Sequence, residues 1–119
     1  MPLLLTAVGD NAVHVSQRCV SLTGTGIHTM GSAPDSSVVI DYSSISPTHA
    51  QIWYDGTVGE WKIRNFAQVR TNGVFFPDED NHMQRVDGER VLHHEDEFCL
   101  APRSASVWFK VSFPDGKAP

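Results

Sequence analysis

The sequence predicts an all-β protein, specifically a β-sandwich made of two sheets. About ten short stretches alternate between apolar and polar residues, and Gly, Pro and Asp residues separate them at close spacing. No window of eleven or more residues carries a helical period. Seven prolines and nine glycines would also interrupt most helices.

The N-terminal half contains four expected strand regions. Apolar residues alternate in 3–7, which predicts a first strand that ends at the turn pair Gly9-Asp10. A second strand region is expected from Val13 to Leu22, before a Gly-rich turn. Residues 27–30 then form a strand that leads into Gly31, and residues 38–40 (Val-Val-Ile) form a short buried strand.

The middle of the chain predicts a hairpin. Residues 50–54 and 60–66 flank the turn sequence Asp-Gly-Thr-Val-Gly at 55–59. In the second of these strands, Trp61 and Ile63 share one side and are expected in the core.

The C-terminal part continues the pattern of short strands. A solvated acidic loop is expected at 77–82, and the closing strand 106–113 points its alternate apolar residues to one side. The domain is expected to span residues 1–114, with 115–119 as the start of a linker or tail. The other expected strands are 73–76, 84–86, 91–92 and 97–100.

Length and charge restrict the function classes. A chain of 119 residues fits one domain with its own core. A net charge of −5 argues against a general nucleic-acid or membrane binder, because phosphate groups would be repelled. The two cysteines, Cys19 and Cys99, have no metal-ligand spacing and suggest a reducing compartment. The apolar start is too short for a signal peptide, so a nuclear or cytoplasmic protein is expected. No metal and no cofactor are expected.

The sequence resembles forkhead-associated (FHA) domains over nearly its whole length, roughly residues 4–113. The resemblance rests on the order and spacing of Met30-Gly31, Val38-Val39-Ile40, the segment 45–52 (ISPTHAQI), Trp61, Asn72-Gly73 and the segment 94–100 (HEDEFCL). It implies an eleven-stranded β-sandwich whose tip loops recognise phosphothreonine in partner proteins.

A phosphorylated side chain carries nearly two negative charges and three acceptor oxygens, so its binder must offer convergent donors. Ser46, in a tight loop, can offer its hydroxyl and neighbouring backbone amides, and Asn72 can bond to the backbone of an extended peptide. The resemblance implies that His49 holds the shape of the Ser46 loop. Gly31 and Gly73 permit the turns beside these residues.

The chain departs from the family pattern at three places. Ser32 stands where the family usually has a phosphate-gripping Arg, and losing that bond weakens binding by roughly tenfold to a hundredfold. Pro47 stands where Arg is common, and it also removes a backbone donor. Arg70 stands where the family has Ser or Thr. Arg70 is a candidate to replace the missing charge and Thr71 to replace a hydroxyl, although Arg70 also fits a solvated side chain.

Ordinary structural roles compete with several of these assignments. Ser46 could simply close a turn, and Asn72-Gly73 is by itself an ordinary hairpin turn. The run His93-His94-Glu95-Asp96 suggests a metal site, but neighbouring strand residues face opposite sides, so we interpret it as a turn.

Three functions remain open. The first is a phosphothreonine-peptide-binding module with a site lined by Ser32, Ser46, Arg70, Thr71 and Asn72. The second is a degenerate FHA domain that acts as a phosphate-independent scaffold or oligomerisation module. The third is an enzyme, which we do not expect, because no nucleophile–base pair, metal set or paired carboxylates occur at useful spacing.

Overall fold

The computed structural model of this chain describes residues 2–24, 26–42, 44–67, 73–101 and 106–114. Within these residues it contains eleven strands and one 3-10 helix, which confirms the predicted all-β fold. In chain order the elements are β1 (Leu3–Val8), η1 (Asp10–His14), β2 (Cys19–Leu22), β3 (Ile27–Gly31), β4 (Val38–Val39), β5 (Ala50–Asp55), β6 (Glu60–Asn65), β7 (Val74–Pro77), β8 (Met83–Arg85), β9 (Glu89–Val91), β10 (Glu97–Leu100) and β11 (Val107–Ser112).

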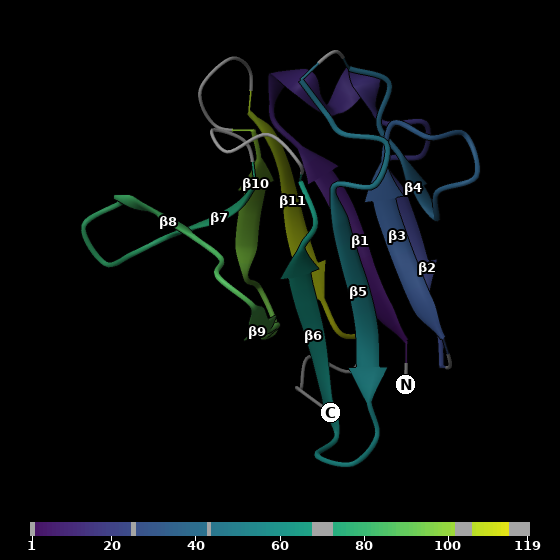
Figure 1. Cartoon of the computed structure of the whole chain (residues 1–119). Helices are drawn as coiled ribbons and strands as arrows, with labels where there is room; N and C mark the ends of the chain where they lie inside the picture. The colour runs from purple at the N-terminus through teal and green to yellow at the C-terminus, as the bar shows by residue number, and fades with distance from the viewer. Residues whose placement is uncertain (1, 25, 43, 68–72, 102–105, 115–119) are drawn as a thin grey trace.

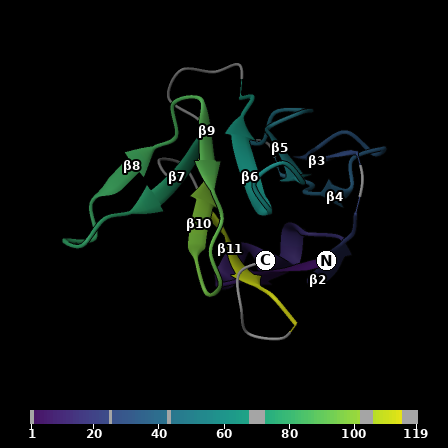
Figure 2. The same cartoon turned by 90° about the horizontal axis from the view of Figure 1, so that it is seen from below.

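The strands form two sheets that pack face to face (Figures 1 and 2). The six-stranded sheet has the order β2-β1-β11-β10-β7-β8, and the five-stranded sheet has the order β4-β3-β5-β6-β9. β1 and β11 pair antiparallel, with Leu5 opposite Val111, so the first and last strands lie side by side. β3 and β4 pair in parallel. Among the described residues, no helix is long and apolar enough to cross a membrane.

Alternation of apolar and polar residues builds the core between the sheets. β1 buries every second side chain, and β11 does the same opposite it. Trp61 is fully buried, as predicted, and the rings of Phe98 and Phe109 stack with centroids 5.7 Å apart. Each fully buried side chain of this size contributes about 1.5–3 kcal/mol through removal of apolar surface from water. The core thereby fixes the positions from which the connecting loops start.

One expected strand region is wrong in its first part. Val13 lies in η1 with 71% of its surface exposed, and β2 begins only at Cys19. The chain leaves β1 at Gly9, whose φ of 84° suits glycine. Turn bonds of the 3-10 type follow, because the Ala12 amide donates to the Gly9 carbonyl at 3.2 Å. Val15 then forms an isolated β-bridge with Ile40, which directly follows β4 at the edge of the five-stranded sheet.

Several of the connections gather at one end of the sandwich. In Figure 1, η1 and the β3–β4 and β4–β5 connections lie at the top, whereas the β5–β6 hairpin lies at the opposite end. The β7–β8 hairpin projects from the side of the molecule (Figures 1 and 2). The predicted hairpin turn at 55–59 is confirmed, and Lys62 Nζ donates to Asp55 Oδ2 at 2.9 Å across it.

Candidate functional site

Two consecutive connections, on either side of β4, lie against each other at this end of the sandwich. The Ser32 amide donates to the Ser46 carbonyl at 3.0 Å, and the Ala33 amide donates to the Pro47 carbonyl at 3.2 Å. These two bonds hold the β3–β4 connection against the β4–β5 connection. The structure therefore brings Ser32 and Ser46 together. We call residues 31–36 and 44–49 the tip loops.

Gly31 permits this close approach. A Cβ atom on Gly31 would lie 2.0 Å from the carbonyl oxygen of Pro47 and 2.9 Å from that of Ser46. Both atoms belong to the backbone, so no side-chain rotation could relieve the overlap. Gly31 is not one of the glycines with positive φ. The requirement for glycine here is therefore spatial, and any side chain would push the two connections apart.

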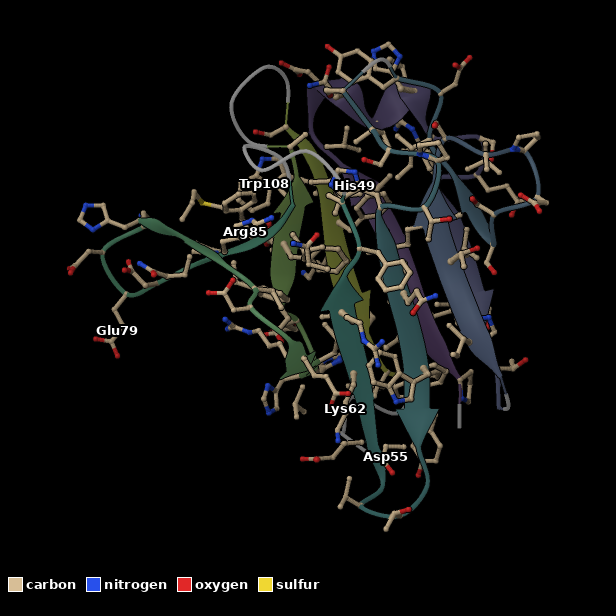
Figure 3. All side chains as sticks on the ribbon, in the orientation of Figure 1. His49, Asp55, Lys62, Glu79, Arg85 and Trp108 are labelled. Carbon is tan, nitrogen blue, oxygen red and sulfur yellow. The ribbon has the colours of Figure 1, made fainter. Side chains whose placement is uncertain are left out.

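His49 joins the Ser46 loop to the start of β7. Its Nδ1 accepts the Ser46 amide at 3.1 Å, and its Nε2 lies 2.9 Å from the Gly73 carbonyl. Its own amide donates to the Met30 carbonyl at 2.7 Å, and its carbonyl accepts the Phe66 amide at 2.8 Å. Figure 3 shows His49 at the upper end of β5. One buried residue thus fixes four segments relative to one another.

The bonding pattern of His49 defines its protonation state. Because Nδ1 accepts a hydrogen bond from an amide, the proton must be on Nε2, which donates to the Gly73 carbonyl. Burial lowers the pKa of His49, and the bond to the Gly73 carbonyl opposes that shift only in part. His49 is fully buried. The neutral ring is therefore the form that holds the loop.

The tip loops keep several donors unused. Within the described residues, the hydroxyls of Ser32, Ser46 and Thr48 make no hydrogen bond, and neither does the Thr48 amide. Ser46 retains 9% of its surface exposed. By contrast, His49 occupies the Ser46 amide, and Pro47 has no amide to offer. The sequence singled out Ser32 and Ser46 but not Thr48, which follows Pro47 in the same loop.

Three predicted site residues, Arg70, Thr71 and Asn72, lie outside the described residues. Gly73, which follows them, is described. Its carbonyl accepts His49 and also the Ala101 amide at 3.2 Å. The structure therefore connects the Ser46 loop to the start of β7 through His49.

Arg85 is a cation near Gly73 that the sequence did not reveal. A Cβ atom on Gly73 would lie 2.8 Å from Arg85 Nε, so the guanidinium group lies beside the Gly73 backbone. Arg85 stands opposite Phe75 in the β7–β8 pair, and its Nη1 lies 3.9 Å from Asp87 Oδ1. Figure 3 shows Arg85 on the inner part of that hairpin, toward the body of the domain. Only the register of this hairpin could have indicated its position.

The acidic and histidine clusters serve local turns. The Asp96 carboxylate accepts the His93 amide at 2.8 Å, which agrees with a turn at 93–96. In the β7–β8 loop, one oxygen of Asp78 accepts the amides of Asp80 and His82, each at 2.9 Å. These bonds lower the pKa of Asp78. Asp78, Asp80 and His82 could bring three ligand atoms within 4.8 Å, but their geometry is already explained by the loop.

The chain matches the model of a known protein family. The family model of the FHA domain matches residues 28–101. The chain is similar to the N-terminal FHA domain of Rad53p from S. cerevisiae in complex with a phosphothreonine peptide, with a TM-score of 0.74, 15% identity, and coverage of 97% of this chain and 95% of that one. No curated protein matches the chain significantly.

Two further solved structures have the same fold. An FHA domain of an Arabidopsis thaliana hypothetical protein gives a TM-score of 0.69 at 17% identity, covering 94% of this chain and 85% of that one. The Slr1951 protein from Synechocystis sp. gives 0.68 at 20% identity, covering 94% and 95%. These similarities establish the sandwich topology, and the family model covers more than half of the chain. The chain belongs to the FHA domain family.

Proposed function

We propose that this chain is a protein–protein interaction module that binds phosphothreonine peptides at its tip loops. The observation that carries the proposal is the Ser46 hydroxyl, which makes no hydrogen bond within the described residues although His49 anchors the backbone that bears it. Family membership supports the ligand class, since the similar Rad53p domain was solved with a phosphothreonine peptide. Arg70, Thr71 and Asn72 complete the proposed site.

The donors around Ser46 suit a phosphate group. Phosphothreonine carries about −1.5 to −2 charges and three acceptor oxygens at neutral pH. The hydroxyls of Ser32, Ser46 and Thr48 together with the Thr48 amide can supply several of the hydrogen bonds that such an anion needs. Because the loops are already fixed by His49 and by the bond from Ser32 to Ser46, little ordering entropy is lost on binding.

Replacement of Ser46 by Ala should weaken phosphopeptide binding about tenfold, because one donor to the phosphate is lost. The melting temperature should hardly change, since the hydroxyl makes no bond within the described residues. The measurement is a fluorescence-anisotropy titration with the best peptide from a degenerate phosphothreonine library. Ser21→Ala, on the exposed part of β2, is the matched control. Unchanged affinity in Ser46→Ala would remove Ser46 from the site.

We propose that Arg85 supplies part of the positive charge that the site lacks because Ser32 stands where the family usually has Arg. Its guanidinium group lies beside Gly73. Arg85→Gln should therefore weaken phosphopeptide binding about fivefold to twentyfold and reduce its dependence on salt. Arg64→Gln, which removes the same charge from the outer side of β6, should change the affinity less than about twofold. Equal losses in the two variants would show that only net charge matters.

A second function is favoured by two residues. Ser32 and Pro47 stand at positions where the family usually has Arg, so the site lacks two cations. If the remaining donors do not suffice to bind a phosphate group, the domain would act as a phosphate-independent scaffold or oligomerisation module. Treatment of the partner peptide with phosphatase separates the two functions, because loss of binding supports phosphate recognition and unchanged binding supports the scaffold.

A further inference from the structure

A groove lies on the side of the domain that carries the β7–β8 hairpin. Its volume is about 560 Å³, and its walls come from the β7–β8 hairpin, β9, the β9–β10 turn, β10 and β11. Figure 3 shows Trp108, one of the lining residues, on this side of the molecule close to β7 and β8. All of the lining residues come from elements other than the tip loops. The groove is therefore a feature distinct from the proposed phosphothreonine site.

Apolar side chains form one wall of the groove. Trp108, Met83 and Pro77 line it, and each is only half-buried. Met83 stands opposite Pro77 in the β7–β8 pair, and Trp108 stands opposite Cys99 in the β10–β11 pair. Paired residues face the same side of a sheet, so Met83 and Pro77 lie side by side. The ladder hydrogen bonds of each pair hold the backbone that carries these side chains. A ligand that covered them would remove apolar surface from water, and an indole face also attracts cations.

Carboxylates dominate the polar wall. Glu95, Asp96 and Glu97 line the groove, and among the described residues Glu95 and Glu97 make no ion pair. Asp96 is already engaged, since it accepts the His93 amide at 2.8 Å and lies 3.6 Å from His93 Nδ1. Two exposed carboxylates, Glu95 in the β9–β10 turn and Glu97 at the start of β10, therefore remain available to a cation.

Two cations lie near these carboxylates. Arg90 lines the groove, but its guanidinium carbon lies 3.9 Å from the ring centroid of Phe76, against which it is stacked. Lys110 stands opposite Glu97 in the β10–β11 register, outside the lining. The lining itself thus holds three carboxylates and one guanidinium group. Its charge is negative, as is the whole chain at −5.

We propose that this groove binds a basic segment of a partner protein. An Arg or Lys side chain fits both walls, because its alkyl stem can pack on Trp108 and Met83 while its charge lies near Glu95 and Glu97. The volume suits a few side chains of an extended peptide. Recognition of the basic segment does not depend on phosphothreonine binding, so the two can be tested separately.

The probe is the unphosphorylated peptide acetyl-Arg-Leu-Arg-Leu-Arg-amide, titrated into the isotope-labelled chain and followed by NMR. Its Arg residues share one face when the peptide is extended. Saturable shifts are expected at the Trp108 indole N–H and at the amides of Met83 and Glu97. The same peptide with Gln in place of Arg should bind at least about tenfold more weakly, because it lacks the charges that the carboxylates attract.

A pair of double variants tests the carboxylates. Glu95→Gln with Glu97→Gln should weaken binding of the Arg peptide about tenfold, and both residues are exposed, so the fold should be retained. Asp41→Asn with Glu60→Gln removes the same charge away from both the groove and the tip loops and should weaken binding less than about twofold. Equal weakening by both pairs, or shifts that leave Trp108 unchanged, would overturn the proposal in favour of general attraction to an acidic protein.

Discussion

Replacement of Gly31 by Ala is expected to destabilise the domain by about 3 kcal/mol and to abolish measurable phosphopeptide binding. The added methyl group would lie 2.0 Å from the Pro47 carbonyl oxygen and 2.6 Å from its carbon. Relief requires the two tip loops to separate, which breaks the bonds from Ser32 to Ser46 and from Ala33 to Pro47. Thermal unfolding should show a melting temperature lower by roughly 8–15 °C.

Gly56→Ala is the matched control for this prediction. Gly56 lies in the β5–β6 turn, where an added Cβ would meet only a Tyr54 ring carbon, at 3.9 Å. That distance is an ordinary contact, so stability and binding should both stay within error of the original chain. If Gly31→Ala melts normally and binds normally, the close approach of the tip loops is not needed for either property.

The sequence predicted strands best where the period of two is regular. The alternation in β1 and β11 and the turn composition at 55–59 depend only on neighbours in the chain, and the structure confirms these elements. The segment from Val13 was wrong because Gly9 allows the chain to turn into η1, which its apolar residues do not reveal. Local pattern therefore succeeded for strands and failed for an irregular connection.

The geometry of the tip loops depends on contacts between distant residues. Gly31 must lack a side chain because the Pro47 backbone lies so close to it. The second hydrogen-bond partner of His49 is Gly73, which follows the β5–β6 hairpin in the chain. No property of Gly31 or His49 alone specifies those distances. The resemblance to FHA domains singled out both Gly31 and His49. It did not indicate that His49 consumes the Ser46 amide, or that Arg85 lies beside Gly73.

Replacement of His49 by Phe is expected to destabilise the domain by about 2–4 kcal/mol and to weaken phosphopeptide binding more than tenfold. Phe keeps a ring of similar volume but removes both nitrogens. The Gly73 carbonyl would retain the Ala101 amide, whereas the buried Ser46 amide would lose the partner that His49 Nδ1 provides. Urea unfolding measures the change, and His82→Ala at an exposed loop position should leave stability unchanged.

The pH dependence of the stability difference between the original chain and His49→Phe tests whether His49 is held as a neutral ring. Burial holds the pKa of folded His49 below its ordinary value of 6.5, so the unfolded chain binds the proton more readily. The contribution of His49 to stability should be complete above pH 6.5 and should decline as the pH falls through the lowered pKa of the folded state. The advantage of the original chain over His49→Phe should therefore shrink on acidification, by at most about 1.4 kcal/mol per pH unit. A constant advantage from pH 7.5 to the acid limit of folding would mean that His49 binds its proton equally well in the folded and unfolded chains, which contradicts a ring held in the neutral form.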